Sequence, residues 1–169
     1  PATEFVTWSE RGEEKSPQAQ YDTMSVEEIA ALPIGHLARG DALLFLWATF
    51  AMLPEALVFM KSWGFKYVTG GAWHKRTVHG KTSYGPGYRL RSSTEPFLIG
   101  TVGRPITSRA HRNLIEGLRR EHSRKPDEAY AWCETYMPNA RRADVFSRED
   151  RPGWESCGFE KGKFNTVAA

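Results

Sequence analysis

The sequence predicts one α/β domain in which a mostly parallel central sheet is flanked by helices. Segments with the residue pattern of strands alternate along the chain with segments typical of amphipathic helices. Residues 42–48 are apolar at every position, which is typical of a strand covered on both faces. Candidate ligand-binding residues follow predicted strands, and crevices in such folds form at the carboxyl ends of strands.

Composition limits the classes of protein to consider. A chain of 169 residues with 40% hydrophobic residues can fill one globular domain but not two. The formal charge is only +3, so a surface for nucleic acid would require clustered basic residues. The two cysteines, Cys133 and Cys157, form neither a disulfide framework nor a zinc ligand set, and we predict no metal site. Without an apolar membrane span or a signal peptide, we expect a cytoplasmic protein that does not bind membranes.

The first third of the chain contains two helix signals around one strand. Residues 1–20 lack the pattern of a packed element, and we expect a mobile loop there. Ser25 followed by Glu28 has the spacing of a capping box, so a short helix should begin there and end before Pro33. Residues 42–48 should then form a central parallel strand.

A second helix should begin at Pro54 and end at Gly64. Its apolar stripe contains Leu53, Leu57 and Met60, which we expect to face the core. Further strands are predicted over residues 66–74, 95–101, 113–118 and 143–147.

A basic segment, LRREHSRKPDE at residues 118–128, joins the strand at 113–118 to another helix. Pro126 suits the first position of that helix, and Asp127 and Glu128 suit its first turn. Free backbone N–H groups at a helix start favour a carboxylate or a phosphate. By local physics alone, the segment is either such an anion site or a solvated turn with an ordinary helix cap.

The helix that begins at Pro126 should bury Ala129, Tyr130 and Cys133 and stop at Pro138. Cys133 is therefore predicted to be a core residue rather than a nucleophile.

A second group of basic residues lies between positions 75 and 91, with Tyr84 and Tyr88 interleaved. Basic side chains suit phosphates and aromatic rings suit unstacked bases, so this stretch is a candidate nucleic-acid surface. The alternatives are a solvated hairpin and a protein interface. The basic residues are Lys75, Arg76, Lys81, Arg89 and Arg91.

The segment His122–Glu128 resembles the HSRKPDE signature of the adenine-N6 methyltransferase family known as MT-A-seventy. This family includes the catalytic subunit of the messenger-RNA adenosine methyltransferase and many bacterial and phage DNA adenine methylases. The resemblance runs from about Trp8 to Phe164 and includes the segments Tyr21–Ser25, Leu44–Thr49, Trp63–Phe65, Trp73–Lys75, Val145–Arg148 and Pro152–Trp154. It implies a Rossmann-like methyltransferase fold.

The resemblance also implies a cofactor and an activity. Members of the family transfer a methyl group from S-adenosyl-L-methionine to the exocyclic N6 amine of adenine. By matching position, Lys125 should reach the methionine carboxylate of the cofactor, and Tyr21 should line the pocket for the target base. The full set of implied cofactor-binding residues is His122, Ser123, Lys125, Arg148, Asp150, Phe159 and Glu160.

The expected macromolecular substrate is DNA, with RNA as the alternative, in a bacterial cell or a phage-infected host. Trp8, Arg11 and Lys15 lie where the family has a substrate-gating loop. Arg119, Arg120 and Arg124 are predicted to contact phosphates, together with the basic residues between 75 and 91. A homodimer or a methyltransferase-like partner is also expected from the family.

One family motif does not match. An Asp-Pro-Pro-aromatic motif should precede the Trp8 loop, but the sequence opens Pro1-Ala2-Thr3-Glu4-Phe5. Three explanations are open: Pro1 is the last proline of a motif whose upstream strand is absent from this sequence, the chain is truncated, or it is a silent homologue that binds nucleic acid or an active partner. Glu4 is a weak candidate for a substitute acceptor. Methylation of the cytosine amine is a further alternative function with similar chemistry.

Overall fold

The computed structural model describes residues 24–85, 89–121 and 123–165. Contacts divide the described chain into two compact units. The first contains the residues up to Ala72 together with Tyr84–Pro105, and the second contains Trp73–Ser83 and the residues from Ile106 onward. Several residues predicted to have functions lie outside the described residues: Trp8, Arg11, Lys15, Tyr21 and His122.

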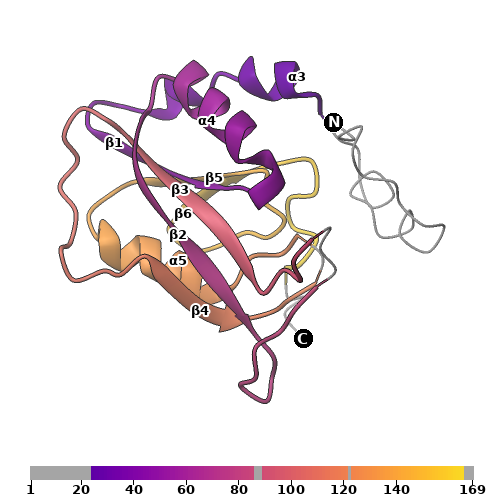
Figure 1. The fold of residues 1–169 in the computed structure, drawn as a ribbon. Coiled ribbons are helices and arrows are strands. Elements are labelled where there is room, and N and C mark those ends of the chain that lie inside the picture. Colours follow the sequence, from indigo (N-terminus) through magenta and orange to yellow (C-terminus); the bar gives the residue numbers. More distant parts are fainter. Residues whose placement is uncertain (1–23, 86–88, 122, 166–169) are drawn as a thin grey trace. The chain divides into compact units, whose positions relative to one another are not determined.

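Among its described residues, the first unit contains two helices, two short 3-10 helices and strands of one sheet. Its elements are α3 (Val26–Ala30), η1 (Ile34–Leu37), β1 (Ala42–Trp47), η2 (Phe50–Met52), α4 (Leu53–Ser62), the first part of β2 (Lys66–Arg76) and β3 (Thr94–Val102), all labelled or coloured in Figure 1. The predicted capping box is confirmed, because the Glu28 N–H donates to the Ser25 hydroxyl and the Ser25 N–H donates to the Glu28 carboxylate.

Strand β1 has a different position from the one that its apolar sequence predicts. It stands at the end of the described strand order and pairs with β3, which lies between β1 and β2. The pair is antiparallel, with Ala42 opposite Val102 and Trp47 opposite Phe97. The predicted parallel direction is therefore wrong, and β1 is not central among the described strands, although the α/β class holds. An apolar run indicates burial but carries no information on strand direction, and every residue of β1 is half-buried.

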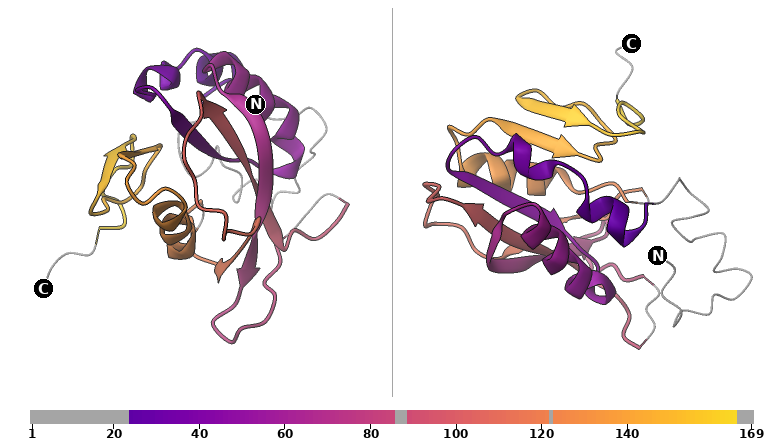
Figure 2. Two further views of the ribbon diagram at one scale, coloured as in Figure 1. Left: turned by 90° about the vertical axis from the view of Figure 1, so that its left-hand side faces the viewer. Right: turned by 90° about the horizontal axis from the view of Figure 1, so that it is seen from above.

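Helix α4 lies against the strands of the first unit (Figure 2), and its buried residues belong to the hydrophobic core there. Ala56, Phe59 and Met60 are buried and cluster with Trp63 and Leu98. Leu57 was expected in this stripe but is 43% exposed. The helical period selects the residues that face the sheet, and here it places Ala56 rather than Leu57 on that face.

The end of α4 forms as predicted. Gly64 has φ of +82°, a conformation that glycine adopts at little cost. The Gly64 N–H donates to the Lys61 carbonyl at 3.0 Å, and the Phe65 N–H donates to the Met60 carbonyl at 2.9 Å. These two bonds form a Schellman motif, which satisfies the last carbonyls of the helix.

The second unit contains the end of β2 and the carboxyl-terminal elements. These are β4 (Leu114–Leu118), α5 (Asp127–Tyr136), β5 (Arg142–Val145) and β6 (Trp154–Cys157). The predicted strands at 113–118 and 143–147 are confirmed within one or two residues, and β6 was not predicted. Strands β5 and β6 are parallel, with Val145 opposite Cys157.

Helix α5 lies close to β4. Pro126 is the N-cap residue, so the helix begins at Asp127, one residue later than predicted. A Cβ atom on Gly117 of β4 would lie 2.7 Å from the Pro126 Cβ, which explains why glycine is needed there. Ala129 is buried, and Cys133 is half-buried on the same helix.

The predicted core role of Cys133 can be tested by its reactivity. Burial raises the pKa of the Cys133 thiol to about 12, whereas Cys157 is exposed. Because the thiolate is the reactive form, we expect only Cys157 to react rapidly with a disulfide reagent at pH 8. Counting the thiols that react in the folded protein should give one, and denaturant should release the second. Rapid labelling of Cys133 in the folded chain, located by peptide mapping, would contradict its burial.

Candidate cofactor and substrate site

The basic segment at 118–128 lies between the end of β4 and the start of α5, as the sequence predicts. Ser123 is exposed and has φ of +62°, which turns the chain sharply before the helix. Lys125 is half-buried and directly precedes the buried N-cap Pro126. The Ala129 N–H donates a hydrogen bond to the Pro126 carbonyl. The N–H groups of Asp127 and Glu128, which come before Ala129, lie in the first turn of the helix.

An open hollow of about 460 Å³ lies at this corner of the second unit. Most of its lining is charged, so it suits a polar ligand rather than an apolar one. The lining residues are Leu118, Arg119, Arg120, Glu121, Asp127 and Glu128.

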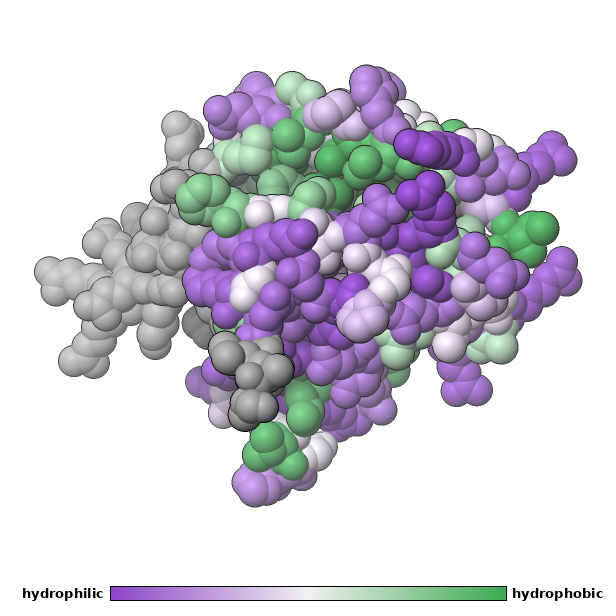
Figure 3. All heavy atoms as spheres, turned by 180° about the vertical axis from the view of Figure 1, so that it is seen from behind, coloured by the Kyte–Doolittle hydropathy of each residue, from purple (hydrophilic) through white to green (hydrophobic). Residues whose placement is uncertain are grey.

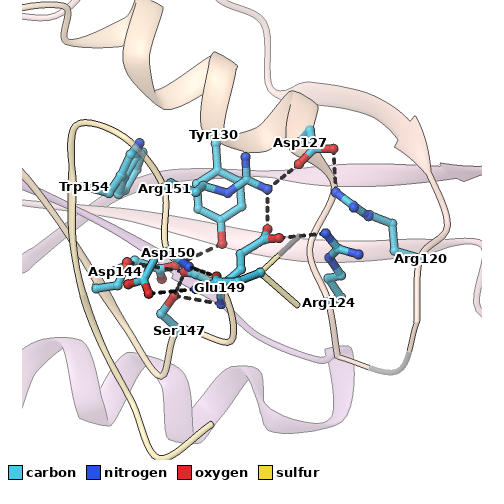
Figure 4. Close-up of polar contacts among 12 residues, drawn as sticks. Arg120, Arg124, Asp127, Tyr130, Asp144, Ser147, Glu149, Asp150, Arg151 and Trp154 are labelled. Atoms are coloured by element: carbon cyan, nitrogen blue, oxygen red, sulfur yellow. Dashed lines mark hydrogen bonds and ion pairs between the residues drawn. The ribbon is translucent and has the colours of Figure 1, made fainter. Parts of the chain in front are cut away.

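Arginines and carboxylates form a connected ion-pair network beside this hollow (Figure 4). The Arg120 Nη1 lies 2.5 Å from the Asp127 carboxylate, and the Arg124 Nη2 donates to Glu149 at 2.7 Å. Arg151 donates to both Asp127 and Glu149. Glu149 is only 8% exposed, so its contacts are poorly screened by water. The network joins the segment before α5 to the loop after β5.

Neither Glu149 nor Arg151 was identified by sequence reasoning. The one signal was the charged run that follows β5, residues 148–151, and such runs are more often solvated.

The network sets the charge states of its members. Burial raises the pKa of the Asp127 carboxyl, but hydrogen bonds from Arg151 and Arg120 outweigh it and hold that pKa below its ordinary value. Burial lowers the pKa of the Arg124 guanidinium, but hydrogen bonds to Glu149 and Glu121 hold it above its ordinary value. These groups therefore stay charged around neutral pH.

Tyr130 and Asp144 form a second polar contact below α5 (Figure 4). The Tyr130 hydroxyl donates to the Asp144 carboxylate at 2.9 Å, and the Arg151 guanidinium lies 3.8 Å from the centre of the Tyr130 ring. Burial, with the nearby Asp144 charge, raises the pKa of Tyr130. The phenol is therefore a neutral hydrogen-bond donor, and its bond to Asp144 joins α5 to β5.

Of the predicted cofactor residues after β5, the structure brings Arg148 and Glu160 into contact. Arg148 pairs with Glu160 at 2.7 Å, and its guanidinium lies 4.9 Å from the centre of the Phe164 ring. Asp150 instead accepts a hydrogen bond from the Asn165 side chain at 3.0 Å. Phe159 is 93% exposed. The ion pair orients Arg148 and Glu160 toward each other, so a ligand held by both would lie beside this pair.

Comparison with known proteins identifies the family. A family model described as MT-A70 matches residues 7–160, which include β4, α5 and the whole ion-pair network. The chain belongs to the MT-A70 family. The resemblance predicted from the HSRKPDE segment is confirmed, and the family implies the fold of S-adenosylmethionine-dependent methyltransferases.

Similar MT-A70 proteins occur in bacteria and eukaryotes. The type II methyltransferase M.MunI of a Mycoplasma species is 28% identical over 86% of this chain and 61% of its own length. An MT-A70-like N(6)-adenosine-methyltransferase of Arabidopsis thaliana is 35% identical over 82% of this chain and 21% of its own length. The catalytic subunit METTL3 of Homo sapiens is 29% identical over 82% of this chain and 25% of its own length. The chain thus spans only part of these relatives.

Several residues of this MT-A70 chain that are predicted to bind phosphate form ion pairs with carboxylates in the structure. Arg120 and Arg124 pair with Asp127 and Glu149, as described, and Arg76 pairs with Glu116. Their contacts with phosphate stay predictions.

The remaining basic residues fall in both units. Arg119 and Lys81 are exposed in the second unit, and Lys75 lies over the Trp73 ring. Arg89 and Arg91 belong to the first unit, where Arg91 lies over the Tyr84 ring. The stretch from 75 to 91 is therefore divided between the units.

Among the residues that the structure describes, no helix is long and apolar enough to cross a membrane. The same residues contain no group of three or more histidine, cysteine, aspartate or glutamate side chains placed to hold a metal ion.

In the view of Figure 3, hydrophilic residues cover most of the visible coloured surface, and hydrophobic residues gather toward its upper part.

Proposed function

We propose that this chain transfers the methyl group of S-adenosyl-L-methionine to the exocyclic N6 amine of adenine in nucleic acid, with DNA as the substrate. The match to the MT-A70 family over residues 7–160 carries this proposal. The plant and human relatives, which are named as N(6)-adenosine-methyltransferases, support the same chemistry.

The residues at the start of α5 fit the methionine end of this cofactor. A carboxylate there would meet the Lys125 ammonium and the N–H groups of the first turn. Both kinds of donor favour an anion, and the dipole of the helix adds about 0.3–1 kcal/mol when the site is exposed. Arg148 and Glu160 would hold the nucleoside part, since one donates and the other accepts hydrogen bonds.

Methyl transfer depends on orientation more than on acid or base strength. The cofactor, when bound, supplies an electrophilic methyl group. The adenine amine is a weak nucleophile because its lone pair is delocalised into the ring. The chain must therefore hold the amine in line with the donor and exclude other geometries. In a DNA duplex, the adenine must first leave the base stack. Tyr21, which we propose for the base pocket, is outside the described residues.

A second candidate function is that of a homologue that binds nucleic acid or a methyltransferase partner without transferring methyl groups. Membership of the family supports the fold of this chain more directly than its activity.

An assay with methyl-labelled S-adenosylmethionine separates the two candidates. We expect label to enter an adenine-containing DNA oligonucleotide and not the same oligonucleotide with N6-methyladenine at every adenine. Label in a matched RNA instead would change the substrate, and label in both oligonucleotides would point to the cytosine amine. A chain that binds cofactor or DNA without any transfer would contradict the first candidate and support the silent homologue.

A further inference from the structure

Glu149 is the buried centre of the ion-pair network in Figure 4. Its carboxylate accepts hydrogen bonds from two guanidinium groups, those of Arg124 and Arg151. Its backbone is fixed as well, because the buried Ser147 hydroxyl donates to the Glu149 carbonyl at 2.6 Å. A carboxylate held on both its backbone and its side chain is a rigid anchor.

Ion pairs connect Glu149 to the residues on both sides of Lys125. Arg124, which directly precedes Lys125, pairs with Glu149 at 2.7 Å. Asp127, two residues after Lys125, is held by Arg151, and Arg151 is held in turn by Glu149. The chain on each side of the lysine is thus tied to the same buried carboxylate, directly on one side and through one arginine on the other.

We propose that Glu149 is a positioning residue that fixes the start of α5 and thereby aims Lys125 at the carboxylate of S-adenosylmethionine. The role of Lys125 rests on the proposed function, but the fixing of the helix start does not. Glu149 acts through its arginine partners and not by contact with the cofactor carboxylate, which an acidic side chain would repel.

Burial distinguishes this network from ordinary surface ion pairs. The Arg124 and Glu149 side chains are 16% and 10% exposed, whereas those of the Arg141–Glu155 pair in the same unit are 76% and 70% exposed. Exposed pairs contribute little, but removal of one partner from a buried pair leaves the other charge without compensation. Glu155 is therefore the matched control for Glu149.

The first test is the affinity for S-adenosylmethionine, measured by calorimetric titration. Glu149→Gln keeps the shape of the side chain but removes its charge, and we expect the Kd to rise about tenfold, a coupling typical of residues in one network. Glu155→Gln should leave the Kd unchanged. In a Lys125→Ala background, Glu149→Gln should have no further effect, because its role passes through that lysine. If Glu149→Gln weakened binding as much in the Lys125→Ala background as in the unchanged chain, its role would be generally structural and the proposal would be overturned.

The second test does not require the cofactor. Amide hydrogen exchange of residues 119–129 should become about tenfold faster in Glu149→Gln, since a local opening that costs less free energy is populated more often. Exchange in Glu155→Gln should match the unchanged chain. If the unchanged chain binds no S-adenosylmethionine, the proposed function fails, and the exchange result still decides whether Glu149 fixes the helix start. Equal exchange in both variants would overturn the positioning role.

Discussion

Replacement of Lys125 by alanine is expected to weaken S-adenosylmethionine binding by about 10- to 100-fold while the fold is retained. Hydrogen bonds to charged groups contribute about 1.5–3 kcal/mol, and the carboxylate of the cofactor would lose its cationic partner. The N–H groups of the first turn of α5 remain in the variant and should retain part of the affinity. Calorimetric titration of the purified chain measures this change directly.

Lys61→Ala is the control for that experiment. Lys61 is an exposed lysine in the last turn of α4, in the first unit. The Lys61→Ala variant should bind cofactor like the unchanged chain and melt at a similar temperature, because substitutions of exposed residues usually change stability by less than about 0.5 kcal/mol. Equal affinities for the Lys125→Ala variant and the unchanged chain would remove Lys125 from the site.

Replacement of Phe97 by alanine is expected to destabilise the first unit by about 3–5 kcal/mol, the usual cost of truncating a buried phenylalanine. Phe97 is 1% exposed on β3. Its ring stacks on Phe45 with the ring centres 4.4 Å apart and meets Trp47 edge-on at 5.8 Å. Loss of the ring would leave a cavity on the sheet face beside Phe45 and Trp47, next to the paired segment of β1 and β3. Urea unfolding followed by tryptophan fluorescence should show a lower midpoint.

The same substitution at Phe50 provides the comparison, because that side chain is 59% exposed on η2. Phe50→Ala should leave the urea midpoint nearly unchanged. If both variants unfolded at the same urea concentration, the assignment of Phe97 to the core would be untenable.

Local signals in the sequence determined several elements correctly. The capping box of α3 and the glycine end of α4 depend on residues within six positions of one another, so a local pattern is sufficient to specify them. The same holds for the basic segment before α5, whose proline and acidic residues mark a helix start. The HSRKPDE resemblance, also a local pattern, led to the family that the comparison confirmed.

Tertiary structure alone decided how the strands pair. The sequence of β1 indicates burial, but its antiparallel pairing with β3 depends on residues about 50 to 60 positions away. The same limit applies to the charged site. The ion pairs of Arg120 with Asp127 and of Arg124 with Glu149 could not be predicted, because nothing in the sequence indicates that these partners lie close together.

Glu149 lies 25 residues beyond Arg124, and only the fold brings the two within 2.7 Å. The sequence by itself thus determined the family, most element boundaries and the candidate cofactor lysine. The carboxylate that fixes the segment around that lysine became visible only in the folded chain, because ion pairs between distant residues follow from packing and leave no local pattern.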